Sequence, residues 1–76
     1  MEYGDIKEAL DTARERFIEG DYQTAEGLLQ QVMLKDSAVP EVYQILGTIY
    51  YDQGKFNKAI KHFRRALEID PHYTDA

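Results

Sequence analysis

Two histidines and several carboxylate pairs are the side chains of this sequence with the widest scope for chemistry. His62, Asp70 and His72 are the candidate ligands for a metal ion. No two of them have the separation of four residues that places two ligands side by side on a helix, so we expect no metal site. Carboxylate pairs such as Glu15 and Glu19 are expected to lie on a solvated helix face.

The other sequence patterns that accompany reactive sites are missing from this chain. It contains no cysteine, which excludes thiol nucleophiles, thiolate metal sites and disulfides. It contains no glycine-rich phosphate-binding loop and no calcium-loop pattern. Catalysis requires a nucleophile, a base and an orienting group that converge in a pocket. We therefore expect a protein that is not an enzyme and that has neither catalytic residues nor cofactors.

The charge of the chain limits the partners that it could bind. The formal net charge is −5, whereas nucleic-acid binding requires clustered lysines and arginines that neutralise phosphates. No stretch approaches the roughly 18 apolar residues of a membrane span. Residues 1–5 are acidic and lack the apolar run of a secretory signal. The sequence predicts a cytoplasmic protein that binds neither nucleic acid nor the membrane interior.

Acidic and basic side chains are unevenly distributed along the chain. Residues 1–39 contain nine acidic and four basic side chains, a net charge of −5, whereas residues 40–76 contain five of each. The basic side chains of the second half lie close together in sequence. We interpret them either as a solvated helix face or as a docking surface for an acidic partner on the outer side of a helix. They are Lys55, Lys58, Lys61, Arg64 and Arg65.

Apolar residues recur at steps of three and four along the whole chain, which is the period of a helix with one buried face. No stretch alternates as a β-strand would, so the predicted fold class is all-α. The four amphipathic helices are expected at about residues 4–19, 22–35, 40–53 and 56–69. In the last helix, the residues assigned to the apolar stripe are Phe56, Ala59, Ile60, Phe63, Ala66 and Leu67.

Glycine and proline mark the expected helix ends. Gly20 and Gly54 each follow a helix, where glycine tolerates the left-handed backbone of a C-terminal turn. Pro40 suits a first helical position, because the missing N–H has no partner there. Pro71 disfavours helical geometry at Asp70 and so ends the fourth helix.

The second half of the chain repeats the first with an offset of 34 residues, from Gly20 to Gly54. A helix-turn-helix unit of this length is the signature of one class of repeat protein. We expect Gly47 and Ala59 to be small because the helices of the second pair approach each other closely there. The aligned pairs include Ala13 with Gly47, Gly20 with Gly54, Ala25 with Ala59, and Leu29 with Phe63.

The second copy closely resembles a tetratricopeptide repeat. The matching residues are Tyr43, where the family prefers Trp, and Leu46, Gly47, Tyr50, Gly54, Phe56, Ala59, Phe63, Ala66 and Pro71. The resemblance implies one domain over residues 1–76, with repeat one at about 6–39 and repeat two at about 40–73. It implies tandem antiparallel helix pairs that form a segment of a right-handed α-solenoid, in which residues 74–76 begin a further helix.

The first copy departs from the family pattern. Thr12, Arg16 and Ser37 replace the Leu, the inner Tyr and the Pro, and Gly27 lies inside the second helix. Terminal repeats are often atypical because one side faces solvent, so we expect this copy to be an N-terminal cap. The fourth helix would then be covered either by further repeats of a longer protein or by neighbouring copies.

The resemblance implies a scaffold or adaptor that binds a peptide segment of a partner protein. Such modules bind peptides on a concave face that is lined by the first helix of each pair. Tyr51 lies away from the core stripe of the third helix, which supports a role in the groove. The groove residues that the resemblance implies are Lys7, Leu10, Arg14, Phe17, Gln44, Ile45, Thr48 and Tyr51.

One well-known ligand of this family and one alternative function can be weighed from the same residues. The family's carboxylate clamp for chaperone C-terminal tails needs Lys and Asn where this sequence has Leu10, Arg14 and Ile45, so we do not expect that partner. The alternative is self-assembly into a dimer or filament through the repeat ends. In a filament, acidic side chains of the first helix, such as Glu8 and Glu15, would meet the basic fourth helix of another copy.

Overall fold

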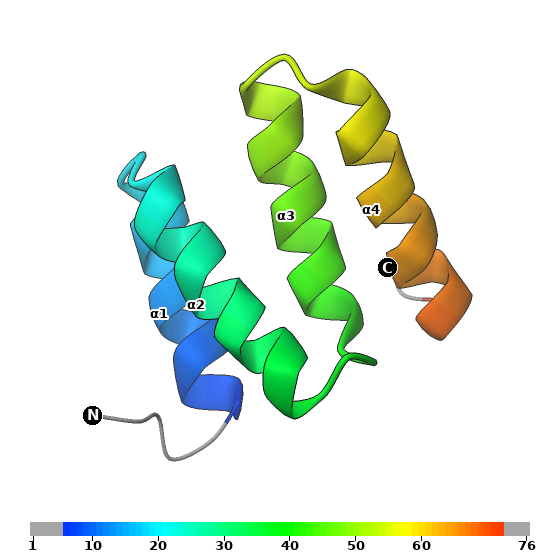
Figure 1. The fold of residues 1–76 in the computed structure, drawn as a ribbon, viewed down its shortest axis with the longest axis horizontal. Coiled ribbons are helices and arrows are strands. Elements are labelled where there is room, and N and C mark those ends of the chain that lie inside the picture. The colour runs from blue at the N-terminus through cyan, green and yellow to red at the C-terminus, as the bar shows by residue number, and fades with distance from the viewer. Residues whose placement is uncertain (1–5, 73–76) are drawn as a thin grey trace. The chain divides into compact units, whose positions relative to one another are not determined.

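The computed structural model describes residues 6–72, and all regular elements in that range are helices (Figure 1). The chain divides into two compact units, Met1–Ser37 and Ala38–Ala76, and each contains one pair of helices. The prediction of an all-α fold is confirmed. The additional turn expected at residues 4–5 and the further helix expected at 74–76 fall outside the described range. The helices are α1 (Ile6–Ile18), α2 (Tyr22–Lys35), α3 (Pro40–Asp52) and α4 (Phe56–Ile69).

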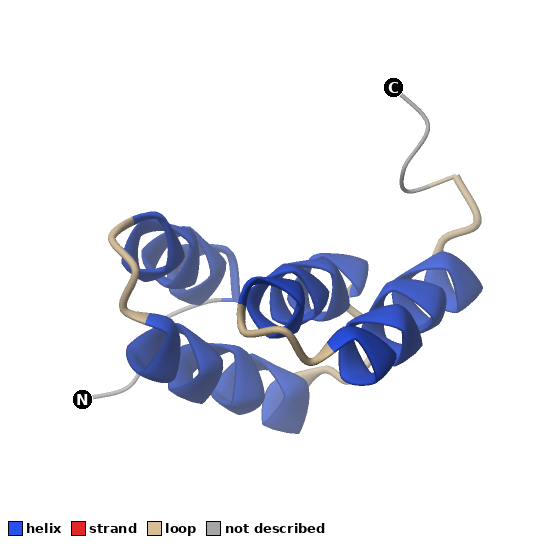
Figure 2. Ribbon diagram, turned by 90° about the horizontal axis from the view of Figure 1, so that it is seen from above, coloured by secondary structure: helices blue, strands red, loops and turns tan. Residues whose placement is uncertain are grey.

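The same glycine turn closes the first helix of each pair (Figure 2). Gly20 and Gly54 have φ angles of 86° and 80°, in the left-handed region that glycine adopts without a steric penalty. In the second turn, the N–H of Gly54 donates to the carbonyl of Tyr51 at 3.0 Å, and that of Lys55 to Tyr50 at 2.8 Å. This pair of hydrogen bonds is the Schellman motif, which satisfies carbonyls at a helix end. The predicted helix breaks are therefore confirmed.

The start of α3 and the end of α4 also follow the predicted residues, and a side chain caps the start of α2. Pro40 occupies the first turn of α3. Asp21 caps α2, because its side chain accepts a hydrogen bond from the N–H of Thr24. Asp70, just before Pro71, has an extended backbone and ends α4.

The two helices of unit 1 pack against each other through small and branched side chains. Ala13 and Ala25 are fully buried, and their lack of bulk allows the helix backbones to approach. Leu29 and Val32 of α2 fill the remaining space. The other buried side chains of this unit are Ala9, Leu10 and Leu28.

Unit 2 distributes its buried residues unequally between its two helices. Six residues of α3 are buried, but only Ala59 and Ala66 of α4 are. A Cβ atom on Gly47 would lie 2.7 Å from the ring of Phe63, which is closer than packed atoms approach. The close contact expected at position 47 is thus present, but the Phe63 ring, rather than Ala59, is its nearest neighbour.

Candidate functional site

On α3, the predicted groove residues present one exposed aromatic ring and two polar side chains. Tyr51 is 59% exposed, and its ring lies edge-on to Phe56 with 5.2 Å between the centroids. The hydroxyl of Thr48 donates to the carbonyl of Gln44 at 3.0 Å, and the Gln44 amide donates to the Thr48 hydroxyl at 3.4 Å. The sequence-based expectation that Tyr51 lies outside the core is confirmed.

On α1, the predicted groove residues are largely engaged with their own helix. Lys7 and Arg14 are exposed, and both lie near the carboxylate of Asp11, at 4.0 and 3.7 Å. Phe17 is half-buried and stacks on Tyr22 of α2, with 5.6 Å between the ring centroids. Exposed ion pairs of this kind contribute little to stability, so the cations can exchange Asp11 for another acidic group.

Two of the predicted groove residues are buried and do not present a surface to a partner. Leu10 and Ile45 belong to the core. The prediction assigned only one stripe of α3 to the core, whereas Val42 and Ile49 are buried together with Ile45 over a wider arc of that helix. Helical periodicity identifies one apolar face, but it does not give the width of the buried arc.

Three of the five basic residues predicted to form an acidic-partner surface instead lie against tyrosine rings of α3. The ammonium groups of Lys55 and Lys58 lie 5.9 and 5.5 Å from the centroid of Tyr50. The guanidinium of Arg65 lies 5.8 Å from the centroid of Tyr43. Such cation–π contacts hold the cations close to α3. The expectation of a single basic surface on the outer side of α4 is therefore wrong for these three residues.

The guanidinium of Arg65 has the most defined electrostatic environment of this group. A side-chain hydrogen bond with Tyr43, followed by one with Glu68, raises the pKa of Arg65 above its ordinary value. The ion pair with Glu68 measures 3.3 Å.

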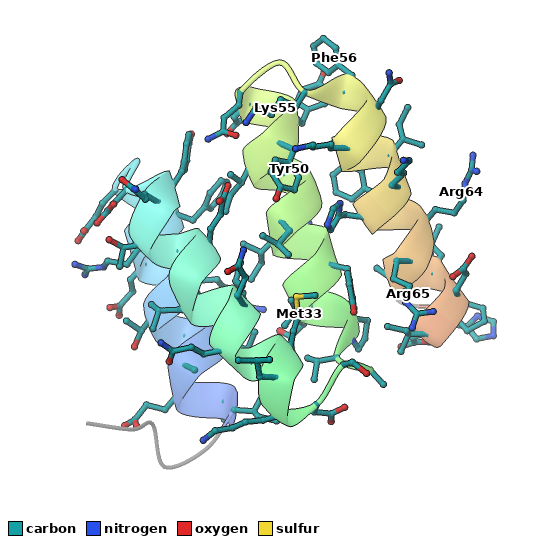
Figure 3. All side chains as sticks on the ribbon, viewed as in Figure 1. Met33, Tyr50, Lys55, Phe56, Arg64 and Arg65 are labelled. Atoms are coloured by element: carbon teal, nitrogen blue, oxygen red, sulfur yellow. The ribbon has the colours of Figure 1, made fainter. Side chains whose placement is uncertain are left out.

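All four basic residues of α4 are exposed, but Lys61 and Arg64 differ from Lys58 and Arg65 in that they lie over neither Tyr43 nor Tyr50. Neither Lys61 nor Arg64 forms an ion pair with another residue in the range 6–72. In Figure 3, Arg64 points away from α3, whereas Arg65 and Lys55 lie on the side of the helix pair that carries Tyr50. The basic surface is thus divided between two sides of α4.

The histidines contact groups that do not suggest metal chemistry. The His62 ring lies 5.0 Å from Tyr50 and 6.2 Å from Tyr43, and its Nδ1 lies 2.8 Å from the carbonyl of Lys58. The backbone N–H of His72 donates to the Asp70 carboxylate at 3.1 Å. Within residues 6–72, no three His, Asp or Glu side chains gather as metal ligands would.

Sequence reasoning missed the exposed apolar side chains of α4. Phe56, Ile60 and Leu67 were assigned to the core stripe, but they are 55%, 52% and 39% exposed. The available signal was their position: they lie toward one edge of the stripe, whereas the buried Ala59 and Ala66 lie at its opposite edge. We call Phe56, Ile60, Phe63 and Leu67 the α4 apolar flank.

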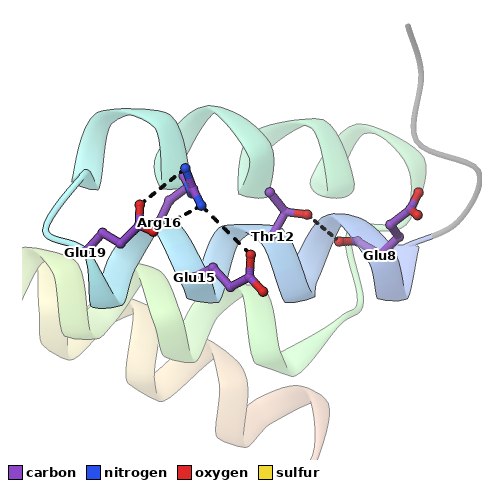
Figure 4. Close-up of polar contacts among 5 residues, drawn as sticks. All are labelled: Glu8, Thr12, Glu15, Arg16 and Glu19. Carbon is purple, nitrogen blue, oxygen red and sulfur yellow. Dashed lines mark hydrogen bonds and ion pairs between the residues drawn. The ribbon is translucent and has the colours of Figure 1, made fainter.

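The outer face of α1, which carries the exposed carboxylates of Glu8, Asp11 and Glu15, is acidic and solvated (Figure 4). Arg16 forms ion pairs with Glu19 at 3.2 Å and with Glu15 at 3.9 Å. Glu8 is exposed, and its carbonyl accepts a hydrogen bond from the hydroxyl of Thr12 at 3.1 Å. This face presents carboxylates to solvent rather than an apolar contact surface.

Comparison with known proteins places the second helix pair in a family. Residues 40–73 match the family profile described as "Tetratricopeptide repeat". This range contains α3, the glycine turn and α4, and so includes the exposed ring of Tyr51. No helix within residues 6–72 has the length and apolar character to cross a membrane.

Three curated proteins have similar sequences. They are the DnaJ homolog subfamily C member 7 homolog of Dictyostelium discoideum (33% identical over 72% of this chain), the transcription factor tau 131 kDa subunit of Saccharomyces cerevisiae (38% over 87%) and the cell division cycle protein 27 homolog A of Arabidopsis thaliana (39% over 75%). The matched segment spans 10%, 6% and 8% of those proteins, respectively. The similarity therefore concerns a helical repeat segment within much longer proteins.

Proposed function

Residues 40–73 make this chain a member of the tetratricopeptide repeat family, and from this premise we propose that it binds a peptide segment of a partner protein through the exposed side chains of α3. The family consists of protein-interaction modules, which makes a protein partner the expected ligand. The observation that carries the proposal is the exposure of Tyr51 on the first helix of the pair.

Tyr51 has the properties of an anchor for a peptide. A tyrosine ring supplies a large contact area and a polar hydroxyl, with few rotatable bonds to order on binding. Its edge-on contact with Phe56 already restricts the ring in the free protein. Less conformational entropy is then lost when a peptide binds, which favours affinity.

Gln44 and Thr48 provide polar groups on the same side of α3 as Tyr51. The three residues follow one another at steps of four and three, which places them along one face of the helix. The hydrogen bonds between Gln44 and Thr48 are only partly buried, so an extended peptide backbone can compete for them. Tyr51 would thus supply apolar contact area, and Gln44 and Thr48 would supply hydrogen bonds.

On α1, the proposal includes the exposed side chains of Lys7 and Arg14 and the half-buried ring of Phe17. The two cations would bind acidic groups of the partner in exchange for Asp11. Because α1 and α3 belong to different compact units, each set is proposed as a contact surface of its own unit.

Substitution of Tyr51 tests the proposal. Immobilised wild-type protein and the Tyr51→Ala variant would be exposed to extract, and the retained proteins would be quantified by mass spectrometry. We expect Tyr51→Ala to reduce partner capture by about tenfold, as for an interface anchor, because truncation removes about 1–2 kcal/mol of contact energy. The helical circular dichroism should be unchanged, because the ring lies largely outside the core.

Leu34→Ala is the matched control, because Leu34 is an apolar helical residue that is 88% exposed and lies outside the proposed surface. Its capture profile should equal that of the wild type. Equal capture by Tyr51→Ala and Leu34→Ala would contradict the proposal. Loss of helical signal in Tyr51→Ala would instead show that the ring supports the fold.

Self-assembly is the second candidate, and the exposed α4 apolar flank is the observation that favours it. The filament form, however, needs the outer face of α1 to cover that flank. Glu8, Asp11 and Glu15 on this face are exposed and charged. The positions 34 residues later are the buried Val42, Ile45 and Ile49. The outer face of α1 thus carries charged side chains, as a face in contact with solvent does, and these charges disfavour head-to-tail stacking of α1 on the α4 apolar flank of another copy.

A further inference from the structure

Four cations border one another along one side of α4. They follow at steps of three, three and four, so each is adjacent to the next on the helix surface. From the first to the last they extend over about 15 Å, at 1.5 Å per residue. Arg64 is not one of them, because it points away from α3 (Figure 3). The four residues, which we call the α4 cationic stripe, are Lys55, Lys58, Lys61 and Arg65.

The helix-pair fold does not require these cations. The positions 34 residues earlier in unit 1 contain no basic residue. Both units nevertheless form the same helix pair with the same glycine turn. The α4 cationic stripe is therefore a property of unit 2 alone. The corresponding residues of unit 1 are Asp21, Thr24, Gly27 and Gln31.

The carboxylates of unit 2 offset only one end of the α4 cationic stripe. Glu68 forms an ion pair with Arg65 at 3.3 Å. Glu41 and Asp52 of α3 each lie two residues from a tyrosine that contacts the stripe. Residues two apart do not share a helix face, so these two carboxylates lie on another side of α3. The positive charge is thus concentrated at the lysines, toward the start of α4.

The lysines of the stripe are accessible to an anionic ligand. Lys55, Lys58 and Lys61 are exposed, and none of them forms an ion pair with another residue in the range 6–72. The ammonium groups of Lys55 and Lys58 both lie within 6 Å of the Tyr50 centroid, at 5.9 and 5.5 Å. Each ammonium carries three donors, so contact with the ring leaves donors for an acceptor. The ring also restricts the lysines, which reduces the entropy that they lose on binding.

We propose that the α4 cationic stripe is a second interaction surface, which binds an extended acidic segment of a partner protein. Alternate residues of an extended chain point to the same side, and three alternate carboxylates span about 13 Å. This length fits within the stripe, where the carboxylates pair with the lysines. Charge complementarity of this kind supplies specificity and selects against basic segments. The net charge of −5 disfavours a nucleic acid as the ligand.

The α1 face of a second copy fits the α4 cationic stripe less well. Its carboxylates lie beside cations of their own helix: Asp11 is near Lys7 and Arg14, and Glu15 is near Arg16. These cations would approach the stripe together with the carboxylates, and like charges repel. An acidic segment without cations avoids this repulsion.

Three labelled peptides test the surface by fluorescence anisotropy. Each has nine residues in a serine background, with three alternate glutamates, three alternate glutamines or a single central glutamate. The three-glutamate peptide should bind the full chain at least about tenfold more tightly than the glutamine peptide. It should bind at least about threefold more tightly than the single-glutamate peptide, because one carboxylate cannot span the stripe. Both preferences should decrease as salt rises, because the paired charges are exposed.

Variants of the protein locate the binding. Lys58→Gln should weaken the three-glutamate peptide by about threefold, as expected for one exposed ion pair, whereas Lys58→Arg should retain its binding. Lys55→Gln/Lys58→Gln should weaken it by about tenfold. Arg64→Gln is the matched control, because it removes an exposed cation of the same helix outside the stripe, and it should have no effect. Circular dichroism should be the same for all these proteins, because each replaced side chain is exposed.

Several results would overturn the inference. Equal binding of the three-glutamate and glutamine peptides would show that the cations do not select a ligand. Equal weakening by Lys58→Gln and Arg64→Gln would show that only the overall charge acts. Dimerisation of the free chain in sedimentation experiments, abolished by Lys58→Gln, would assign the stripe to a second copy. Tyr51→Ala should bind the three-glutamate peptide as the wild type does, so this test is independent of the proposed peptide site on α3.

Discussion

The contact between Gly47 and Phe63 fixes the distance between α3 and α4. The ring lies 2.7 Å from where a Cβ atom of residue 47 would be, so any side chain at this position would force the ring to move. In unit 1 the corresponding residues are Ala13 and Leu29, and both are fully buried. The contact in the first helix pair thus combines an alanine with a leucine, and the contact in the second combines a glycine with the larger phenylalanine ring.

Gly47→Ala should destabilise the protein. Overpacking against Phe63 costs about 1–3 kcal/mol, which exceeds the roughly 1 kcal/mol that alanine gains over glycine in a helix. We expect the free energy of unfolding, measured by urea denaturation, to fall by about 1 kcal/mol.

The double variant Gly47→Ala/Phe63→Leu is the control for this contact. It restores the alanine–leucine combination of unit 1, so it should lose less stability than the sum of its two single variants. A denaturation midpoint that does not change, or that rises, in Gly47→Ala would show that the ring moves aside freely and that the contact does not limit the helix spacing.

At the scale of the helices, the sequence predicts where each element begins and ends, because those signals are local. The positive φ angles at Gly20 and Gly54, and the position of Pro40 in a first turn, depend on the backbone of only a few residues. The exposure of a side chain depends on distant packing. For this reason the apolar pattern placed Ile60 in the core, and the groove prediction placed Ile45 on the surface.

The candidate site could be predicted in part for the same reason. Tyr51 was identified because it falls outside the apolar stripe of its own helix. The tyrosine contacts of Lys58 and Arg65 could not be predicted, because they depend on how α4 is rotated against α3. The periodicity of α4 alone does not specify that rotation, since its apolar arc is wider than the face that it buries.

Gly27 allows a direct test of whether α2 needs a glycine at this position. It lies inside the helix and is exposed, and beyond its chain neighbours and the backbone of its own helix no atom lies within 4 Å of where its Cβ would be. Alanine loses less backbone entropy on folding than glycine, so Gly27→Ala should raise the free energy of unfolding by about 0.5–1 kcal/mol. Urea denaturation measures this gain, and Gly47→Ala is the matched substitution with the opposite sign. A loss of stability in Gly27→Ala would mean that residue 27 contacts another part of the chain.

At the scale of the whole molecule, the surface chemistry is divided among the helices. The outer face of α1 is acidic, α3 presents Tyr51, and α4 combines an apolar flank with cations. The two helix pairs thus share one fold but present different side chains to solvent. This is the behaviour of a repeat protein, in which shared core positions maintain the fold and the remaining positions determine the partner.

Site-specific photo-crosslinking from residue 51 tests whether the exposed side chains of α3 contact a partner protein. A benzophenone amino acid would replace Tyr51 in one protein and Leu34 in another, and both would be illuminated in the presence of extract. A crosslinked partner protein is expected from position 51 and none from position 34, because residue 51 lies on the proposed α3 surface and residue 34 lies outside it. Crosslinking of the same proteins from both positions, or from position 34 alone, would contradict this expectation.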